Sequence, residues 1–458
     1  MKNLFRNTMA IATASLFLST PIKAESLSEA LVKAYVHNPV LQAARHEYEG
    51  VLYMVPEAQA GYRPSVNAFA SQAWTRDENT INGNIPGFFE QTDLSTQQYG
   101  VEIVQALFKG GRTSAAVASA KSFVEAQSYA LQKSEQDVLL SVVESYLGLK
   151  EHLAIERLRE KNVHVLEEQR QATEEQFEVG TITKTDLSQA DSRLSQAQAA
   201  LIEAKGETNK ARALYEKTIG IPNAFLLEDD FKTIENITLP QTIGFVLEEA
   251  DSDHPIIIQA MALKNAALHD VDNVFGELLP QLTATGSVSK TYEPSVNIEE
   301  NDNARFSFDL SVPLYQGGAT RARMVAQQKL VLQREDEINE ARRSVRLQAI
   351  SAWNDYISNE SQISALKKQI EAAELALEGV IAESQVGART VLDILDAEEE
   401  LLDARVSLVS AETAYEISRF TVLSVLGDLT ISGLELDVNA YNAQEKYEDA
   451  DGNWMFFE

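Results

Sequence analysis

The sequence predicts a mixed α and β membrane protein in which one half of the chain is repeated. Three observations predict this fold class. Turn motifs recur at a fixed spacing along the 458 residues, short segments alternate apolar and polar residues, and two 67-residue stretches contain no proline and a single glycine each. Two amphipathic strands and a long helical hairpin are therefore expected in each half.

Composition excludes several functional classes. The chain has no cysteine, which rules out disulfides, thiol catalysis, zinc ribbons and iron–sulfur clusters. It carries 69 acidic against 39 basic side chains, a formal net charge of −30. Because phosphate contacts need clustered lysine and arginine, this charge argues against a nucleic-acid partner.

The first residues have the pattern of a secretory signal peptide, which we predict to span 1–24. Lys2 and Arg6 supply positive charge, Met9–Leu18 is short and mostly apolar, and Ala24 is the expected cleavage site. No later segment has 18 consecutive apolar residues, so no membrane-spanning helix is predicted. Periplasm, outer membrane and secretion remain as destinations.

The internal repeat is defined by its turns. Pro39, which follows a histidine by two positions, returns as Pro255, 216 positions later. Farther along the chain the spacing is 207, and it relates Gly110 to Gly317, Gly111 to Gly318, Gly180 to Gly387 and Gly220 to Gly427. This predicts a first repeat over 25–220, a linker over 221–242, a second repeat over 243–427 and a C-terminal tail over 428–458.

Each repeat is expected to begin with a helical stretch, over 27–61 in the first copy and 243–276 in the second. Both are interrupted near the start by the turn that contains His37 or His254. These histidines have no second ligand at metal-binding spacing, so we assign them to helix boundaries and predict no metal site.

Two strands follow in each repeat. Leu282–Val288 and Phe306–Val312 alternate apolar and polar residues, and Tyr99–Ile103 shows the same period in the first copy. One lipid-facing and one water-facing side would produce this alternation. We expect polar, acidic loops between the strands, roughly over 75–97 and 290–304.

The pattern becomes helical after each Gly-Gly pair. Residues 112–178 and 319–385 are rich in Ala, Gln, Glu and Leu, and each would form a helix on the order of 100 Å long. Their sparse apolar spacing predicts coiled-coil-like packing.

The long helices are expected to end in tight turns. Gly180 suits the left-handed residue that ends a helix, and Thr183 with Asp186 forms a capping box for the returning helix. Gly387, Thr390 and Asp393 repeat this pattern. Each repeat should therefore end in a helical hairpin.

Four amphipathic strands cannot close a barrel, and an open sheet edge cannot face lipid, so the strands require oligomerisation if they enter a membrane. Two chains would supply eight strands, whose interior is filled by side chains. Three chains would supply twelve, enough for an open lumen that continues into a tube of helical hairpins.

Neither an enzyme nor a cofactor site is predicted. The Gly-Gly pairs lack the Lys-Ser/Thr ending of a phosphate loop, and no Gly-x-Ser-x-Gly elbow is present. A trimeric coiled-coil adhesin and a periplasmic adaptor protein would share the long helices and the export signal. Four strands placed symmetrically in two repeats favour a channel over both.

The repeat layout, the Gly-Gly junctions and the Val-Gly-x-x-Thr-x-x-Asp turns resemble the TolC family of outer-membrane factors. The stretch Val386–Ala397 carries the most specific part of the resemblance, and Tyr441–Glu458 is similar to tails in the type I secretion branch. The resemblance implies a homotrimer with a 12-stranded transmembrane β-barrel in outer-membrane lipid and a long α-helical periplasmic barrel. It also implies a periplasmic adaptor, an inner-membrane transporter of the ABC, RND or MFS type, and export of drugs or proteins.

Specific residues match the family pattern. Asp393 and Asp396 match paired aspartates that form rings at the periplasmic entrance, which implies a preference for cations. Thr185, Asp186 and Arg389 match residues that link neighbouring helices and hold the entrance shut.

One position departs from the family pattern, and two further positions match it. Ser384 stands where the family's gating tyrosine is expected, which implies a looser resting closure. Gly180 and Gly387 match glycines of the surface that meets the adaptor.

Overall fold

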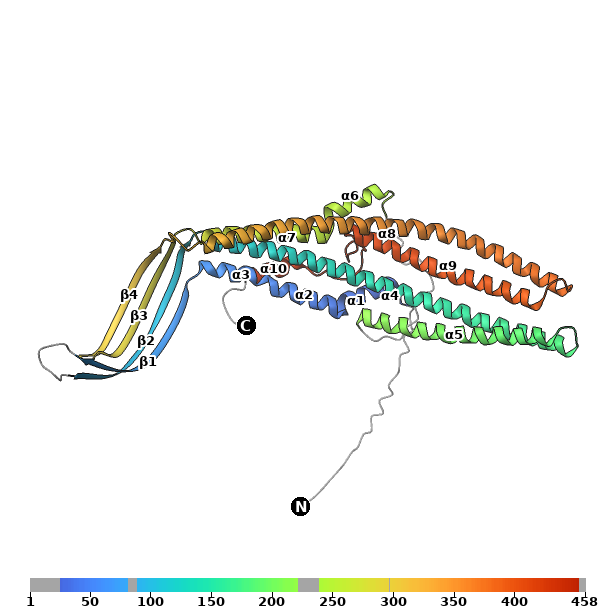
Figure 1. Ribbon diagram of the computed structural model, residues 1–458, viewed down its shortest axis with the longest axis horizontal. Coiled ribbons are helices and arrows are strands. Elements are labelled where there is room, and N and C mark those ends of the chain that lie inside the picture. The colour runs from blue at the N-terminus through green and yellow to red at the C-terminus, as the bar shows by residue number, and fades with distance from the viewer. Residues whose placement is uncertain (1–24, 81–88, 221–238, 296, 453–458) are drawn as a thin grey trace, which may run out of the picture. The chain divides into compact units, whose positions relative to one another are not determined.

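The computed structural model describes residues 25–80, 89–220, 239–295 and 297–452. These residues form ten α-helices, one short 3-10 helix and four strands, shown in Figure 1. The predicted signal peptide, most of the predicted linker and the last residues of the tail lie outside them.

The chain divides into two compact units, which we describe separately. The hairpin unit contains Met1–Ala34, Val142–Ile237 and Ile363–Glu416, and the sheet unit contains Tyr35–Ser141, Thr238–Gln362 and Ile417–Glu458. Three long helices, over 112–178, 319–385 and 391–426, have residues in both units.

The four strands form one antiparallel sheet in the order β1-β2-β3-β4 (Figure 1). Their bounds are β1 Ser65–Thr80, β2 Phe89–Lys109, β3 Gln281–Ser295 and β4 Ile298–Ser311. β1 and β4 are the two edges, and neither pairs with a further strand within the described residues.

The predicted loops between the strands are wrong in extent. Most of 290–304 belongs to β3 and β4, and the described part of 75–97 belongs to β1 and β2. Backbone pairing continues as far as Thr80 opposite Phe89 and Ser295 opposite Ile298. Polar side chains end the apolar alternation in these segments, but they do not prevent strand pairing where one face meets water.

The register aligns one apolar row across all four strands. Val66 lies opposite Ile103, Ile103 lies opposite Gly286, and Gly286 lies opposite Phe306. The next row is polar and contains Asn67, Glu102, Ser287 and Arg305. Residues directly opposite one another point to the same face, so the sheet has one apolar face and one polar face.

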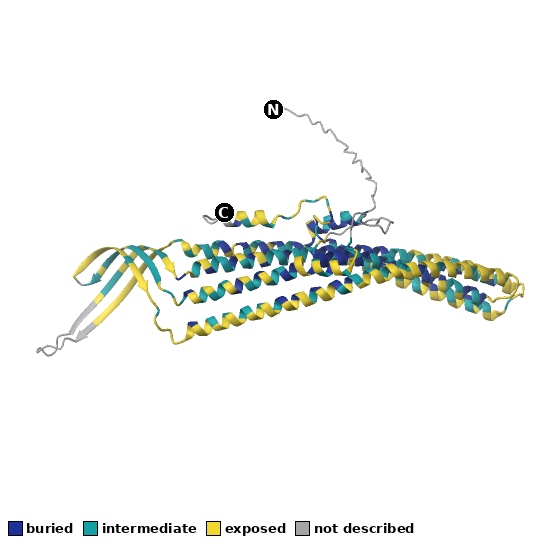
Figure 2. Cartoon of the chain, turned by 90° about the horizontal axis from the view of Figure 1, so that it is seen from above, coloured by how far each residue is buried: buried dark blue, intermediate teal, exposed yellow. Residues whose placement is uncertain are grey.

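The apolar face is exposed in the single chain. Phe306, Phe308 and Leu310 are 69%, 62% and 66% exposed. None of the described strand residues is buried, as the teal and yellow sheet in Figure 2 shows. In β1 this face is made by Val66, Ala68, Ala70 and Trp74, and its small alanines explain why the sequence pattern there was weak.

The sheet joins the long helices at glycine corners. Gly110 has φ 64°, and a Cβ there would lie 2.3 Å from the Gly276 carbonyl oxygen. Only glycine fits this approach, so the predicted corner is confirmed.

The helical stretches at the start of each repeat have the predicted extents and breaks. The first contains α1 (Leu27–His37), α2 (Pro39–Leu52), α3 (Met54–Gln59) and the 3-10 helix η1 (Ala60–Tyr62). The second contains α6 (Ile243–Asp253) and α7 (Pro255–Gly276). His37 ends α1, and His254 caps α7 by accepting a hydrogen bond from the Ile256 amide at 3.3 Å, which confirms the helix-boundary assignment.

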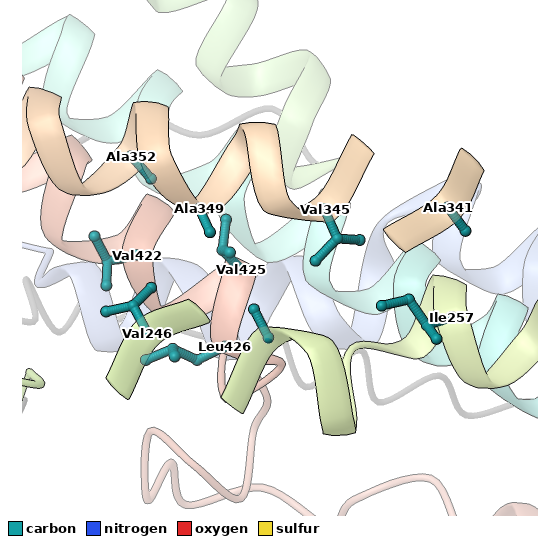
Figure 3. Packing of buried hydrophobic residues seen from close by; sticks show 10 residues of the cluster. Val246, Ile257, Ala341, Val345, Ala349, Ala352, Val422, Val425 and Leu426 are labelled. Carbon is teal, nitrogen blue, oxygen red and sulfur yellow. The ribbon is translucent and has the colours of Figure 1, made fainter. Parts of the chain in front are cut away.

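The sheet unit has a core of small aliphatic side chains. Figure 3 shows Ala341, Val345, Ala349 and Ala352 of α8 (Ala319–Gln385) facing α6, α7 and the end of α9 (Val391–Leu426). The other buried members of the cluster are Val246, Ala250, Ile257, Val422, Val425 and Leu426. Because alanine allows close approach of helix backbones, this core is narrow, as coiled-coil-like packing requires.

The long helices have the predicted bounds. α4 is Arg112–Glu178 and α8 is Ala319–Gln385, each 67 residues long. They return as α5 (Lys184–Ile219) and α9 (Val391–Leu426), each 36 residues long, and α10 (Ala443–Gly452) closes the described chain. Among the described helices, none has the combination of length and hydrophobicity that crossing a membrane would need.

Candidate functional site at the hairpin turns

The first hairpin turns at Gly180, whose φ of 78° is the left-handed conformation expected at a helix end. Thr183 begins α5 and forms a reciprocal capping box with Asp186: the Thr183 amide donates to Asp186 Oδ2 at 2.9 Å, and the Asp186 amide donates to Thr183 Oγ1 at 3.4 Å. The backbone bond and the Thr183 hydroxyl lower the pKa of Asp186, so it carries a negative charge at neutral pH.

The second hairpin repeats this geometry. Gly387 has φ 75°, the Thr390 amide donates to Asp393 Oδ2 at 2.8 Å, and the Asp393 amide donates to Thr390 Oγ1 at 3.3 Å. The pKa of Asp393 is lowered, first by the backbone bond and then by the Thr390 hydroxyl. Both predicted turns are therefore confirmed as structures.

The turns present apolar side chains to solvent in the single chain. Val179 is 74% exposed and Val386 is 80% exposed. No atom lies within 4 Å of the position that a Cβ would take at Gly180 or Gly387. A larger side chain at either glycine would therefore project from the surface.

The three predicted gating residues have mainly local partners within one chain. Thr185 is exposed, and the Asp186 carboxylate accepts from Thr183. Arg389 donates from Nε to Glu383 Oε2 at 2.9 Å, and its Nη1 lies 3.9 Å from Asp393 Oδ1. Their links to neighbouring helices remain a prediction.

Asp396 has a partner that the sequence did not indicate. Arg193 of α5 donates from Nη2 to Asp396 Oδ1 at 2.6 Å and from Nη1 to Glu399 Oε2 at 2.5 Å. The two predicted entrance aspartates therefore differ, because Asp393 caps its own helix whereas Asp396 binds the other hairpin.

A signal for Arg193 was present in the sequence. It lies seven positions after Asp186, two helical turns along the same face. Position 193 corresponds to Glu400 at the 207-residue spacing, so the two returning helices have opposite charges there.

A small cavity of about 50 Å³ lies beside this contact, between α4, α5 and α9. Its lining includes Arg159, Arg193, Glu398 and Leu395. Glu398 Oε2 is buried without a hydrogen-bond partner, and burial raises the pKa of this carboxyl. The hairpin unit thus holds a partly buried acid directly behind the turns.

The sheet with one exposed apolar face and the paired helical hairpins define the class of protein, an outer-membrane export channel. The chain matches the model of the family described as "Outer membrane efflux protein" over residues 30–220 and 246–428. The chain belongs to this family.

Relatives of full length support this membership. The chain is 31% identical to the outer membrane efflux protein BepC of Brucella suis over 433 residues, which cover 94% of this chain and 91% of BepC. It is 24% identical to the outer membrane protein TolC of Escherichia coli over 92% of this chain and 85% of TolC.

Solved structures show the same fold. A crystal structure of CusC superimposes with a TM-score of 0.75 at 18% identity. The match covers 88% of this chain and 92% of the CusC chain. At this identity the likeness establishes the fold.

Proposed function

We propose that three copies of this outer-membrane efflux protein assemble into one exit channel. Each copy would supply four strands to a twelve-stranded transmembrane barrel, and its hairpins would extend into the periplasm as part of a helical tube. A single observation supports the proposal: the sheet has an exposed apolar face in the rows nearest the helices, and its two edges, β1 and β4, pair with no further strand among the described residues. Lipid would cover that face, and neighbouring copies would pair the edges.

The hairpin turns are the proposed contact with a periplasmic adaptor, which links the channel to an inner-membrane transporter. Exposed Val179 and Val386, next to the unhindered Gly180 and Gly387, support this assignment. A partner's helices would cover these valines and remove them from water.

Asp393 and Asp396 are the proposed carboxylates of the periplasmic entrance. Three copies would place six such groups around one constriction and favour cations. Thr185, Asp186 and Arg389 are the proposed links that keep the entrance closed, with Ser384 leaving that closure looser than a tyrosine would.

A tandem duplication underlies the proposed assembly. The separate family matches over 30–220 and 246–428, and the equal lengths of the corresponding long helices, support repeats over 25–220 and 243–427 joined by a linker over 221–242. Threefold symmetry of a duplicated chain would give a tube of six similar hairpins.

The proposed channel performs no reaction, and the transporter would select the cargo. One passive channel could export either drugs or secreted proteins. The four-stranded sheet distinguishes the channel from an adhesin stalk, and the two hairpins distinguish it from an adaptor, which normally has one.

The test is to extract the protein from outer membranes and measure its assembly and conductance. We expect a heat-modifiable trimer band and discrete ion conductance in planar bilayers. A water-soluble protein, or one that stays monomeric in detergent and conducts no ions, would contradict the proposal.

A further inference from the structure

We propose that Arg193 is a positioning residue that sets the charge and closure of the channel entrance, because it binds two acidic residues of the second hairpin. This inference rests on the proposed channel function. It concerns the contacts of Arg193 with Asp396 and Glu399, which we call the Arg193 bridge.

The bridge joins the two returning helices. The guanidinium donates from one nitrogen to Asp396 at 2.6 Å and from the other to Glu399 at 2.5 Å. Asp396 and Glu399 are three positions apart, so they lie on one face of α9 and reach the same arginine. The planar fork of arginine suits two acceptors at once, whereas lysine is a single point of charge.

Arg193 lies opposite a strongly acidic part of α9. The first part of α9, residues 391–404, contains six acids and no basic residue. Farther from the turns, Arg159 approaches Asp403 at 3.7 Å. Loss of Arg193 would therefore leave Asp396 and Glu399 as close like charges.

The bridge is partly buried, which increases its effect. The Arg193 side chain is only 29% exposed, against 55% for Asp396 and 42% for Glu399. The Arg193 bridge also borders the cavity beside Glu398. Partial burial of Arg193 reduces the screening of its charge by salt.

The neighbouring Arg170 offers a matched control. It binds Asp191 of α5 at 2.9 Å and Glu174 of α4 at 2.7 Å, so it also holds two acids. Its contacts stay within the first hairpin, whereas those of Arg193 connect two hairpins. Comparing variants of the two arginines therefore distinguishes the effect of losing any arginine from the effect of losing the contact between the hairpins.

The experiment measures ion selectivity of purified trimers in planar bilayers under a KCl gradient at low salt. Arg193→Gln should raise the cation-to-anion permeability ratio by roughly twofold or more and increase the open conductance, because it frees Asp396, a proposed entrance carboxylate, together with Glu399. Arg170→Gln should leave both values close to wild type, because neither Asp191 nor Glu174 is a proposed entrance carboxylate. Equal effects of the two variants would overturn the proposal.

A second comparison tests the coupling between the partners. Asp396→Asn should lower cation preference slightly in the wild-type background and clearly more in the Arg193→Gln background. Equal effects in both backgrounds would contradict the bridge. If Arg193→Gln lowers trimer yield, adding Asp396→Asn should restore it, and failure to do so would also count against the inference.

These outcomes differ from failure of the channel itself. If wild-type protein forms no trimer and conducts no ions, the proposed function is wrong. If wild-type conducts and Arg193→Gln behaves as Arg170→Gln, only the role of Arg193 is wrong.

Discussion

The two hairpin turns have the same backbone and different chemistry. Both have a left-handed glycine, a threonine cap and a capping aspartate, with corresponding hydrogen bonds that differ by at most 0.1 Å. Behind the turns, α5 carries Arg193 where α9 carries Glu400. The two hairpins therefore have the same turn backbone, but opposite charges at these corresponding positions of α5 and α9.

This difference shows which features the turn itself requires. Gly180 and Gly387 have open space around them, so their backbone conformation explains the glycine and no contact does. The charges are not needed to form the turn. They determine how the hairpins contact one another, which is where a passive channel can control its opening.

The largest expected effect follows from bulky residues at the turns. Gly180→Leu and Gly387→Leu would each impose left-handed strain of about 1–2 kcal/mol and fill the adaptor surface. Export should fall by at least about tenfold while trimers still form. Drug or protein export and heat-modifiable bands are the measurements. Normal export by one variant would show that only the other turn meets the adaptor.

The next effect concerns the entrance acids. Asp393→Ala combined with Asp396→Ala should lower the cation preference in planar bilayers by about twofold or more, because six carboxylates are lost from the trimer. The corresponding change in the first hairpin, Asp186→Ala with Gln189→Ala, should lower the cation preference less. This variant removes one carboxylate per copy, whereas the first removes two. Unchanged ion selectivity in the Asp393→Ala and Asp396→Ala variant would show that these two aspartates do not line the entrance.

Removing the N-cap threonine should destabilise the starts of α5 and α9 by equal amounts. Thr183→Ala and Thr390→Ala each remove one acceptor of a capping box, and each should destabilise its helix start by about 1 kcal/mol. Hydrogen exchange at the first turns of α5 and α9 measures this local opening free energy. Values that differ by more than about 1 kcal/mol would show that the turns are not equivalent in the assembled protein.

The smallest expected effect is a pH dependence confined to one hairpin. Burial raises the pKa of Glu398, so the neutral form is favoured in the folded hairpin. Its stabilising contribution is fully present below the ordinary glutamate pKa and is lost as pH rises through the raised pKa. Glu398→Gln should abolish this dependence in hydrogen exchange of α9.

The counterpart of Glu398 at the 207-residue spacing is Asp191, which is exposed and bound to Arg170. Asp191→Asn should leave the pH dependence of α9 unchanged. A dependence that persists in Glu398→Gln, or disappears in Asp191→Asn, would assign it to another group.

Much of the fold was predictable because it follows from local patterns. The bounds 112–178 and 319–385 agree with α4 and α8, because each helix starts directly after a Gly-Gly pair and ends at a Val-Gly turn. The strand extents were not predictable, because residues such as Asn301 and Asp302 pair with β3 although their composition indicates a loop. Strand pairing is set by the neighbouring strand, which one segment does not reveal.

Of the candidate site, the sequence predicted the two turns and their capping boxes but not the contact between the hairpins. Thr183 and Asp186 form their contact within four residues, so spacing alone identifies it. Arg193 and Asp396 are 203 positions apart, and their contact depends on the packing of two helices. Opposite charges at the corresponding positions 193 and 400 are visible in the sequence, but sequence spacing does not show which acid Arg193 contacts.

The most direct test of the account is to link β1 of one copy to β4 of the next. The chain has no native cysteine, so a panel of variants with one cysteine on each edge strand can be oxidised without background. We predict covalent dimers and trimers, because the two edges meet only between copies. Exclusive formation of internally linked monomers across the panel would contradict the claim that the barrel wall is shared among chains.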